Sequence, residues 1–67
     1  MNLAKSMKIA LAQKEIRQTD LAEKLGVSDQ LISRWAIKGT ISPSNLELLC
    51  AELGMPVSEF VALGEDQ

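Results

Sequence analysis

Apolar residues recur along this chain at intervals of three and four, the spacing that places side chains on one face of a helix. The first stripe, formed by Leu3, Met7, Ala10 and Leu11, predicts a helix over about residues 2–14. Similar stripes predict four further short helices, over about residues 18–25, 28–37, 43–53 and 58–63. No segment shows the alternation that is typical of a strand. The pattern therefore predicts an all-α fold, a compact bundle of five short helices.

Residues that favour helix ends stand between these stripes. Gly26 and Gly54 each follow an apolar stripe, where a glycine in the left-handed conformation ends a helix. Ser28 and Ser42 are placed to cap the helices that follow them, and Pro43 suits a first helical position. The predicted connections are therefore short.

Length and composition limit the kinds of protein that this can be. A chain of 67 residues has room for one domain with a small core. We expect the domain to span residues 1–64 and to be followed by a frayed tail, 65–67. One cysteine and no histidine exclude a disulfide framework, a zinc site of the usual ligands and a histidine-based catalytic triad. We predict neither an enzyme nor a protein with a metal, a cofactor or a small-molecule ligand.

The chain also lacks the features of a membrane or exported protein. Hydrophobic residues make up 46% of it and charged residues 24%, which is typical of a soluble folded domain. No apolar run approaches the roughly 18 residues that a membrane span requires. The N-terminus carries no continuous apolar segment of the signal-peptide type. We therefore predict a cytoplasmic protein.

The formal net charge of −2 is unevenly distributed. Residues 1–40 contain all seven bases and four acids, a net charge of +3, whereas residues 41–67 contain five acids and no base. Such an asymmetry is typical of chains that bind a charged partner. The net charge of the whole chain therefore does not exclude nucleic acid as that partner.

The predicted helices over 18–25 and 28–37 are separated only by a tight turn at Gly26. Ala22 lies four residues before this glycine, and its small side chain allows two helices to cross closely at a steep angle. Val27 is apolar where the second helix must pack back on the first. This is the arrangement of a helix-turn-helix, which presents one helical face to the major groove of DNA.

The second of these helices divides cleanly into a polar and an apolar arc. We count about 100° per residue from Asp29. The polar arc contains Asp29, Gln30, Ser33 and Arg34. The apolar arc contains Leu31, Ile32 and Trp35. Each side chain of the polar arc can form hydrogen bonds with base edges, so the helix from about Ser28 to Ile37 is predicted to read DNA.

The stretch from Gln18 to Trp35 resembles the signature of phage-repressor and Cro-type helix-turn-helix proteins, the lambda-repressor-like DNA-binding domains. It reads Gln-Thr-x-x-Ala-x-x-Leu-Gly-Val-Ser-x-x-x-Ile-Ser-x-Trp. The later segment 46–60 is similar to the fourth and fifth helices of that family. The resemblance implies a sequence-specific transcriptional regulator of phage or prophage type, a repressor that binds a double-stranded DNA operator as a homodimer.

The resemblance also implies individual DNA contacts. Phosphate contacts are implied for Gln18, Ser28 and Lys38, and the amide of Gln18 could also support a residue of the recognition helix. Base contacts are implied for Asp29, Gln30 and Ser33. For Arg34 it implies either a guanine edge or the backbone. The chain departs from the common pattern at Arg17, which stands where a serine or threonine often caps the second helix.

Some of the side chains that this pattern singles out have a plainer interpretation. Trp35 and Cys50 lie on apolar stripes, where packing in the core is the favoured role. For Leu31, at the edge of the apolar arc, packing is favoured over contact with a thymine methyl group. Candidates for the dimer face are the apolar side chains of the last helix: Phe60, Val61 and Leu63.

A second function is compatible with the same fold. The acidic segment 41–67, which has no base, could bind another protein, as in an antitoxin-type regulator or an adaptor. DNA binding is favoured because the helix-turn-helix lies wholly within the basic part of the chain.

Overall fold

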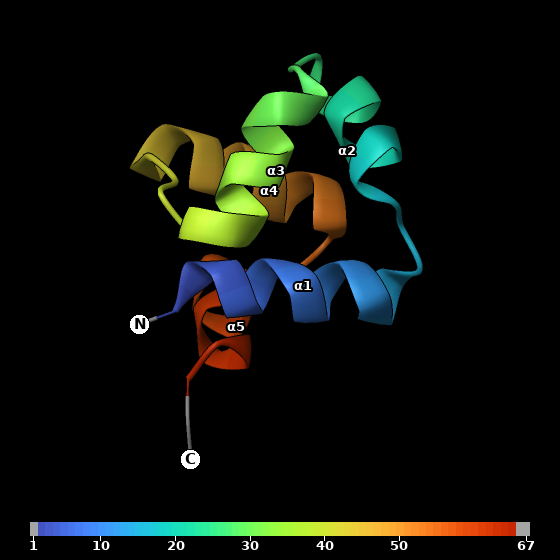
Figure 1. Cartoon of the computed structure of the whole chain (residues 1–67). Coiled ribbons are helices and arrows are strands. Elements are labelled where there is room, and N and C mark those ends of the chain that lie inside the picture. The colour runs from blue at the N-terminus through green and yellow to red at the C-terminus, as the bar shows by residue number, and fades with distance from the viewer. Residues whose placement is uncertain (1, 66–67) are drawn as a thin grey trace.

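The computed structural model describes residues 2–65, which form five α-helices and no strand (Figure 1). The helices are α1 (Leu3–Lys14), α2 (Gln18–Leu25), α3 (Asp29–Lys38), α4 (Pro43–Leu53) and α5 (Val57–Leu63). The predicted all-α bundle is therefore confirmed. Four boundaries differ from the prediction by one residue: α1 begins at Leu3, α3 runs from Asp29 to Lys38, and α5 already begins at Val57. None of these helices is both long and apolar enough to cross a membrane.

Serine side chains cap two of the helices, as the sequence predicts. The Oγ of Ser28 accepts a hydrogen bond from the backbone N–H of Leu31 at 3.2 Å. The Oγ of Ser42 accepts one from the backbone N–H of Asn45 at 3.3 Å. α2 differs, because Arg17 at its N-cap position makes no side-chain capping bond.

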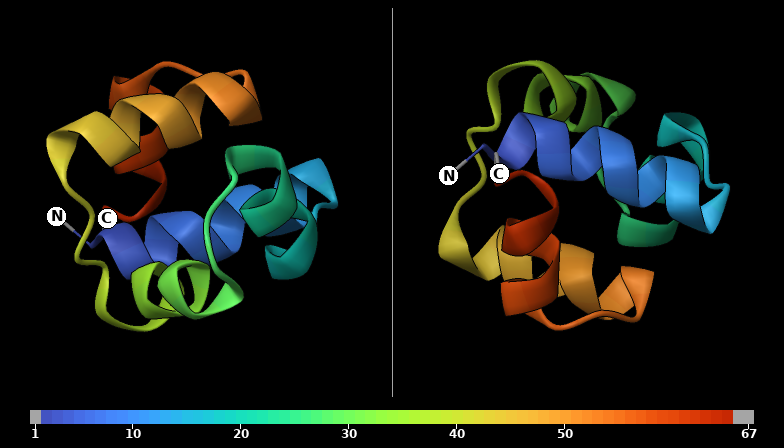
Figure 2. Two further views of the ribbon diagram at one scale, coloured as in Figure 1. Left: turned by 90° about the horizontal axis from the view of Figure 1, so that it is seen from above. Right: turned by 90° about the horizontal axis from the view of Figure 1, so that it is seen from below.

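α1 packs against α3 on one side and against α5 on the other, and α2 packs against α3 and α4 (Figure 1). Seen from above and from below, α3 and α4 lie at opposite sides of the bundle (Figure 2). The face of α3 that points away from the core is therefore remote from α4.

The core joins the apolar stripes of all five helices. Its largest fully buried apolar side chains are Met7, Leu21, Ile32, Trp35, Leu49, Cys50 and Phe60. The core positions predicted for Trp35 and Cys50 are thus confirmed, and burial raises the pKa of the Cys50 thiol. The prediction that Phe60 contributes to a dimer face is wrong. Its side chain is 0% exposed because α5 uses it to pack against the rest of its own domain.

The end of α5 packs on the beginning of α1. Ser6 is buried, and its Oγ donates a hydrogen bond to the carbonyl oxygen of Val61 at 3.4 Å. Gly64 is buried beside it, and a β-carbon there would overlap the Asn2 carbonyl oxygen and the Ser6 hydroxyl. Of the tail predicted to fray, 65–67, only residue 65 is described; residues 66 and 67 lie outside the described residues, and the fraying stays a prediction.

Candidate nucleic-acid interface

The turn between α2 and α3 has the geometry that the sequence predicts. Gly26 has a φ of +70°, and its backbone N–H donates to the Glu23 carbonyl at 3.2 Å. The next N–H, of Val27, donates to the Ala22 carbonyl at 3.0 Å. A β-carbon at position 26 would meet no atom within 4 Å, so the glycine is needed for its backbone conformation and not for space. Ala22 is buried, which brings the two helices close together.

The other end of α3 is held against α1. Gly39 ends the helix with a φ of +70°, and its N–H donates to the Trp35 carbonyl at 3.0 Å. A β-carbon at this position would lie 2.8 Å from the backbone nitrogen of Ala4. Position 39 therefore requires glycine for both conformation and space. α3 is consequently fixed at both ends, by α2 and by α1.

The face of α3 that points away from the core is polar. Asp29, Gln30 and Arg34 are exposed, and Ser33 is half-buried. These four residues form what we call the polar face of α3. The opposite side is filled by core residues, namely Ile32, Trp35 and Ala36. Leu31 is half-buried and packs against the core, as its favoured interpretation requires. The structure thus places on one face the four side chains that the angular positions predicted to lie together.

The three residues predicted to contact phosphate lie at helix ends. Ser28 is exposed at the beginning of α3, where its oxygen accepts the capping bond while its O–H can still donate outward. Lys38 is the exposed last residue of α3. Gln18 is the exposed first residue of α2, where the missing side-chain cap leaves backbone N–H groups that can face an anion.

Sequence reasoning missed one exposed residue on this surface. Ile37 is 70% exposed, the most exposed large hydrophobic side chain of the described residues. At 100° per residue it lies about 80° from Asp29, between Ser33 and Arg34. The signal was present in the sequence, since extending the count beyond Trp35 by two residues places Ile37 on the polar side.

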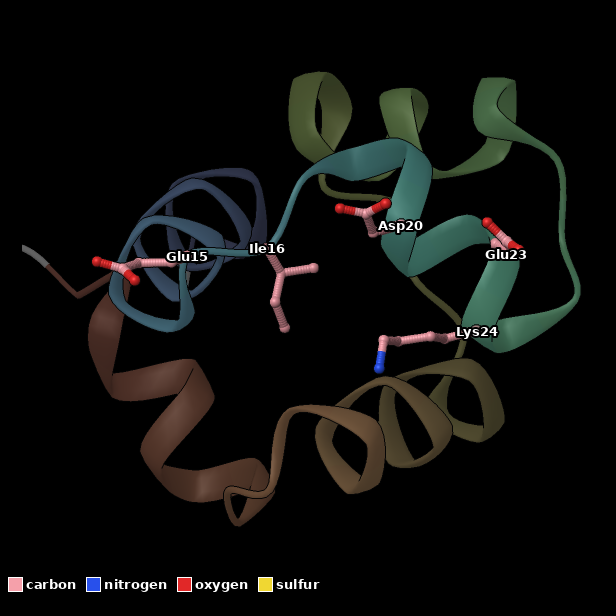
Figure 3. Close-up of a pocket in the computed structure, with 5 residues that line it drawn as sticks. All are labelled: Glu15, Ile16, Asp20, Glu23 and Lys24. Carbon is pink, nitrogen blue, oxygen red and sulfur yellow. The ribbon is translucent and has the colours of Figure 1, made fainter.

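A separate hollow of about 490 Å³ opens beside α2, away from the polar face of α3 (Figure 3). It is lined by Glu15, Ile16, Asp20, Glu23 and Lys24. The Ile16 and Lys24 side chains extend into the space between α1, α2 and α4, whereas the Glu15 carboxylate points away. None of the predicted DNA-binding residues lines this hollow, and three of its five side chains are carboxylates that would repel phosphate.

The charged side chains of the described region all lie at the surface, where they can meet a charged partner. Within residues 2–65, every buried side-chain nitrogen or oxygen has a hydrogen-bond partner. The same part of the chain contains no group of three or more cysteine, aspartate or glutamate side chains that could hold a metal ion. The polar face of α3 offers hydrogen bonding by amide, guanidinium, hydroxyl and carboxylate groups.

Comparison with known proteins identifies one family. A family model described as helix-turn-helix matches residues 7–60, from the middle of α1 to α5. This range includes the turn at Gly26 and the whole of α3. No curated protein and no solved structure matches the chain.

Proposed function

Because the chain belongs to the helix-turn-helix family of DNA-binding transcription regulators, we propose that it is a repressor that reads a specific operator with α3. The observation that carries this proposal is the polar face of α3, which is exposed while both ends of the helix are fixed by glycine turns. An α-helix with its side chains is about 10–12 Å across, which matches the width of the major groove, about 12 Å.

Each side chain of the polar face suits a particular base edge. The amide of Gln30 can pair with adenine through two hydrogen bonds, and the guanidinium of Arg34 can pair with guanine in the same way. Asp29 can accept a hydrogen bond from the amino group of cytosine. Ser33 is half-buried, so its contribution is a single hydrogen bond to a base that comes close to the helix.

Phosphate contacts would fix the orientation of α3 in the groove. Gln18 and Ser28 lie at the first turns of α2 and α3, where the positive end of the helix dipole favours a phosphate. Lys38 would contact the backbone from the other end of α3. α4, whose charged residues are all acidic, lies at the opposite side of the bundle and would be kept away from the duplex.

We propose that the operator is bound by two copies of the chain. One α3 reads only half of a site, and a two-fold dimer places two such helices about 34 Å apart, one turn of the duplex. Phe60 is excluded from the dimer face by its burial, and Val61 and Leu63 are half-buried. Because α5 thus exposes little apolar surface that could hold two free copies together, the dimer is proposed for the DNA-bound state.

Selection from a pool of random DNA duplexes tests the proposal. The purified chain should enrich one near-palindromic motif, and its affinity should fall steeply as salt increases, because bound phosphates release counterions. Gln30→Ala should change the enriched base at one position of each half-site, whereas Lys38→Ala should keep the motif. The proposal fails if no motif is enriched.

A second candidate function is binding to a basic protein partner through α4. Leu48 is 61% exposed on this helix, with Glu47 beside it, and no base occurs in segment 41–67. A partner with an apolar patch rimmed by lysine or arginine would complement this surface. This function would be favoured over the first if the wild type formed a stoichiometric complex with such a partner and enriched no DNA motif. The complex should then be lost in Leu48→Lys.

A further inference from the structure

Two large apolar side chains are strongly exposed in the described part of the chain, Ile37 on α3 and Leu48 on α4. Single exposed apolar residues are common in soluble proteins, so exposure alone assigns no role. Ile37 is distinguished by its position, because it is 70% exposed and lies at the C-terminal end of α3 on the same side as the polar face. Ser33 and Arg34, one turn earlier on the same helix, flank it on the two sides.

The fold itself gives little reason for isoleucine at this position. Trp35 and Ala36, the two preceding residues, are buried and provide the packing of this part of α3. An exposed β-branched residue loses side-chain freedom in a helix and is a weaker helix former than alanine, lysine or arginine. The apolar side chain at position 37 therefore contributes little to the stability of the isolated domain.

Building on the proposed function, we propose that Ile37 is a specificity-determining residue that contacts the C5 methyl group of a thymine. Thymine is the only base whose major-groove edge carries a methyl group, and an apolar side chain is the group that recognises it. The hydrogen-bonding side chains on the same face end in polar groups that would not detect the presence of this methyl, whereas the aliphatic side chain of Ile37 would.

The geometry of α3 places Ile37 at a different base pair from Gln30. The two residues are seven positions apart on the same side of the helix, which is two turns or roughly 10 Å along its axis. Ile37 would therefore meet a base pair further along the groove. The close approach of Gly39 to Ala4 fixes this end of the helix, and Lys38 can bind the adjacent phosphate.

The test combines removal of the isoleucine with removal of the methyl group. Once the operator has been selected, its thymines are replaced one at a time by uracil, which lacks only that methyl. Binding of the wild type and of Ile37→Ala to each of these duplexes is then measured. At one thymine of each half-site, uracil should weaken binding of the wild type about fourfold, from the burial of one methyl group. Ile37→Ala should bind the thymine and uracil operators equally.

Leu48→Ala is the matched control, because Leu48 is also exposed but belongs to α4, the helix at the opposite side of the bundle from α3. It should keep the full preference for thymine over uracil. Thermal unfolding should show that both variants fold as the wild type does, since each replaces an exposed side chain.

Three results would overturn the inference while leaving the proposed function intact. They are an operator that contains no thymine in the region read by α3, an Ile37→Ala variant that retains the wild-type sensitivity to uracil, and a variant that weakens binding to all duplexes by one common factor. If the wild type enriches no motif, the proposed function fails first.

Discussion

α3 and α4 follow the same local rules and differ in what they expose. The two helices have 10 and 11 residues, each is capped by a serine, and each ends at a glycine with φ near +70°. Each also buries one apolar face in the common core. On its outer face, however, α3 carries amide, hydroxyl, guanidinium and ammonium groups beside one carboxylate, whereas the charged residues of α4 are Glu47 and Glu52. The rules that build a helix therefore do not distinguish α3 from α4; the exposed side chains do.

The largest expected effect is on stability and concerns the glycines that end α3 and α4, Gly39 and Gly54. A side chain in the left-handed region costs about 1–2 kcal/mol. Gly54→Ala should therefore lower the free energy of unfolding by about 1 kcal/mol, since nothing lies within 4 Å of its β-carbon. Gly39→Ala adds the close contact with the backbone of Ala4 and should cost at least about 2 kcal/mol. Urea unfolding measures both; equal losses would show that α1 does not constrain the end of α3.

Next in size is the effect of removing a charged side chain from each outer face. Arg34→Ala should weaken binding to the selected operator by about 1–3 kcal/mol and relax the preference at one base pair. Glu47→Ala on α4 should leave affinity and preference unchanged. Competition binding with duplexes that differ at single positions measures both quantities. A loss of specificity in Glu47→Ala would contradict the assignment of DNA reading to α3.

The two capping serines should have equal effects on stability but different effects on DNA binding. Ser28→Ala and Ser42→Ala should each reduce the free energy of unfolding by about 1 kcal/mol, because each leaves a backbone N–H of the first turn without its cap. Only Ser28→Ala should also weaken DNA binding, about fivefold, through the loss of one phosphate contact. Binding titrations under conditions where both variants are folded would reveal the difference.

The smallest effect is expected at Lys38. Replacing it with alanine should weaken all duplexes alike and reduce the slope of log affinity against log salt concentration by about one for each bound copy. Glu52→Ala on α4 should leave the slope unchanged. A variant at position 38 that altered the preferred sequence, and not the slope, would assign Lys38 to base reading.

Local sequence signals predicted most of the helix boundaries and the polar face of α3. Gly26, Ser28 and Ser42 act through their immediate neighbours, so their roles can be inferred from a few adjacent residues. The cap that follows α1 could not be inferred in this way. Glu15 adopts a φ of +56° there although it is not a glycine, the residue that usually signals this conformation. Whether a side chain is used inside its own domain depends on distant segments, and for this reason Phe60 was misassigned to a dimer face.

Two further features required the folded chain. The burial of Ser6 and Gly64 depends on the contact between α1 and α5, which are far apart in sequence. The separation of α3 from α4 is likewise a property of the whole bundle. In the proposed binding mode, this separation keeps the acidic α4 away from the duplex although the net charge of the chain is −2.

The central claim is that the polar face of α3 lies in the major groove, and methylation interference on the selected operator tests it most directly. Methyl groups on guanine N7 occupy the major groove, and those on adenine N3 occupy the minor groove. The account predicts that N7 methylation blocks binding at the guanines paired with Arg34, that this block is lost in Arg34→Ala, and that N3 methylation within the same half-site has no effect. Interference at adenine N3 alone would contradict it.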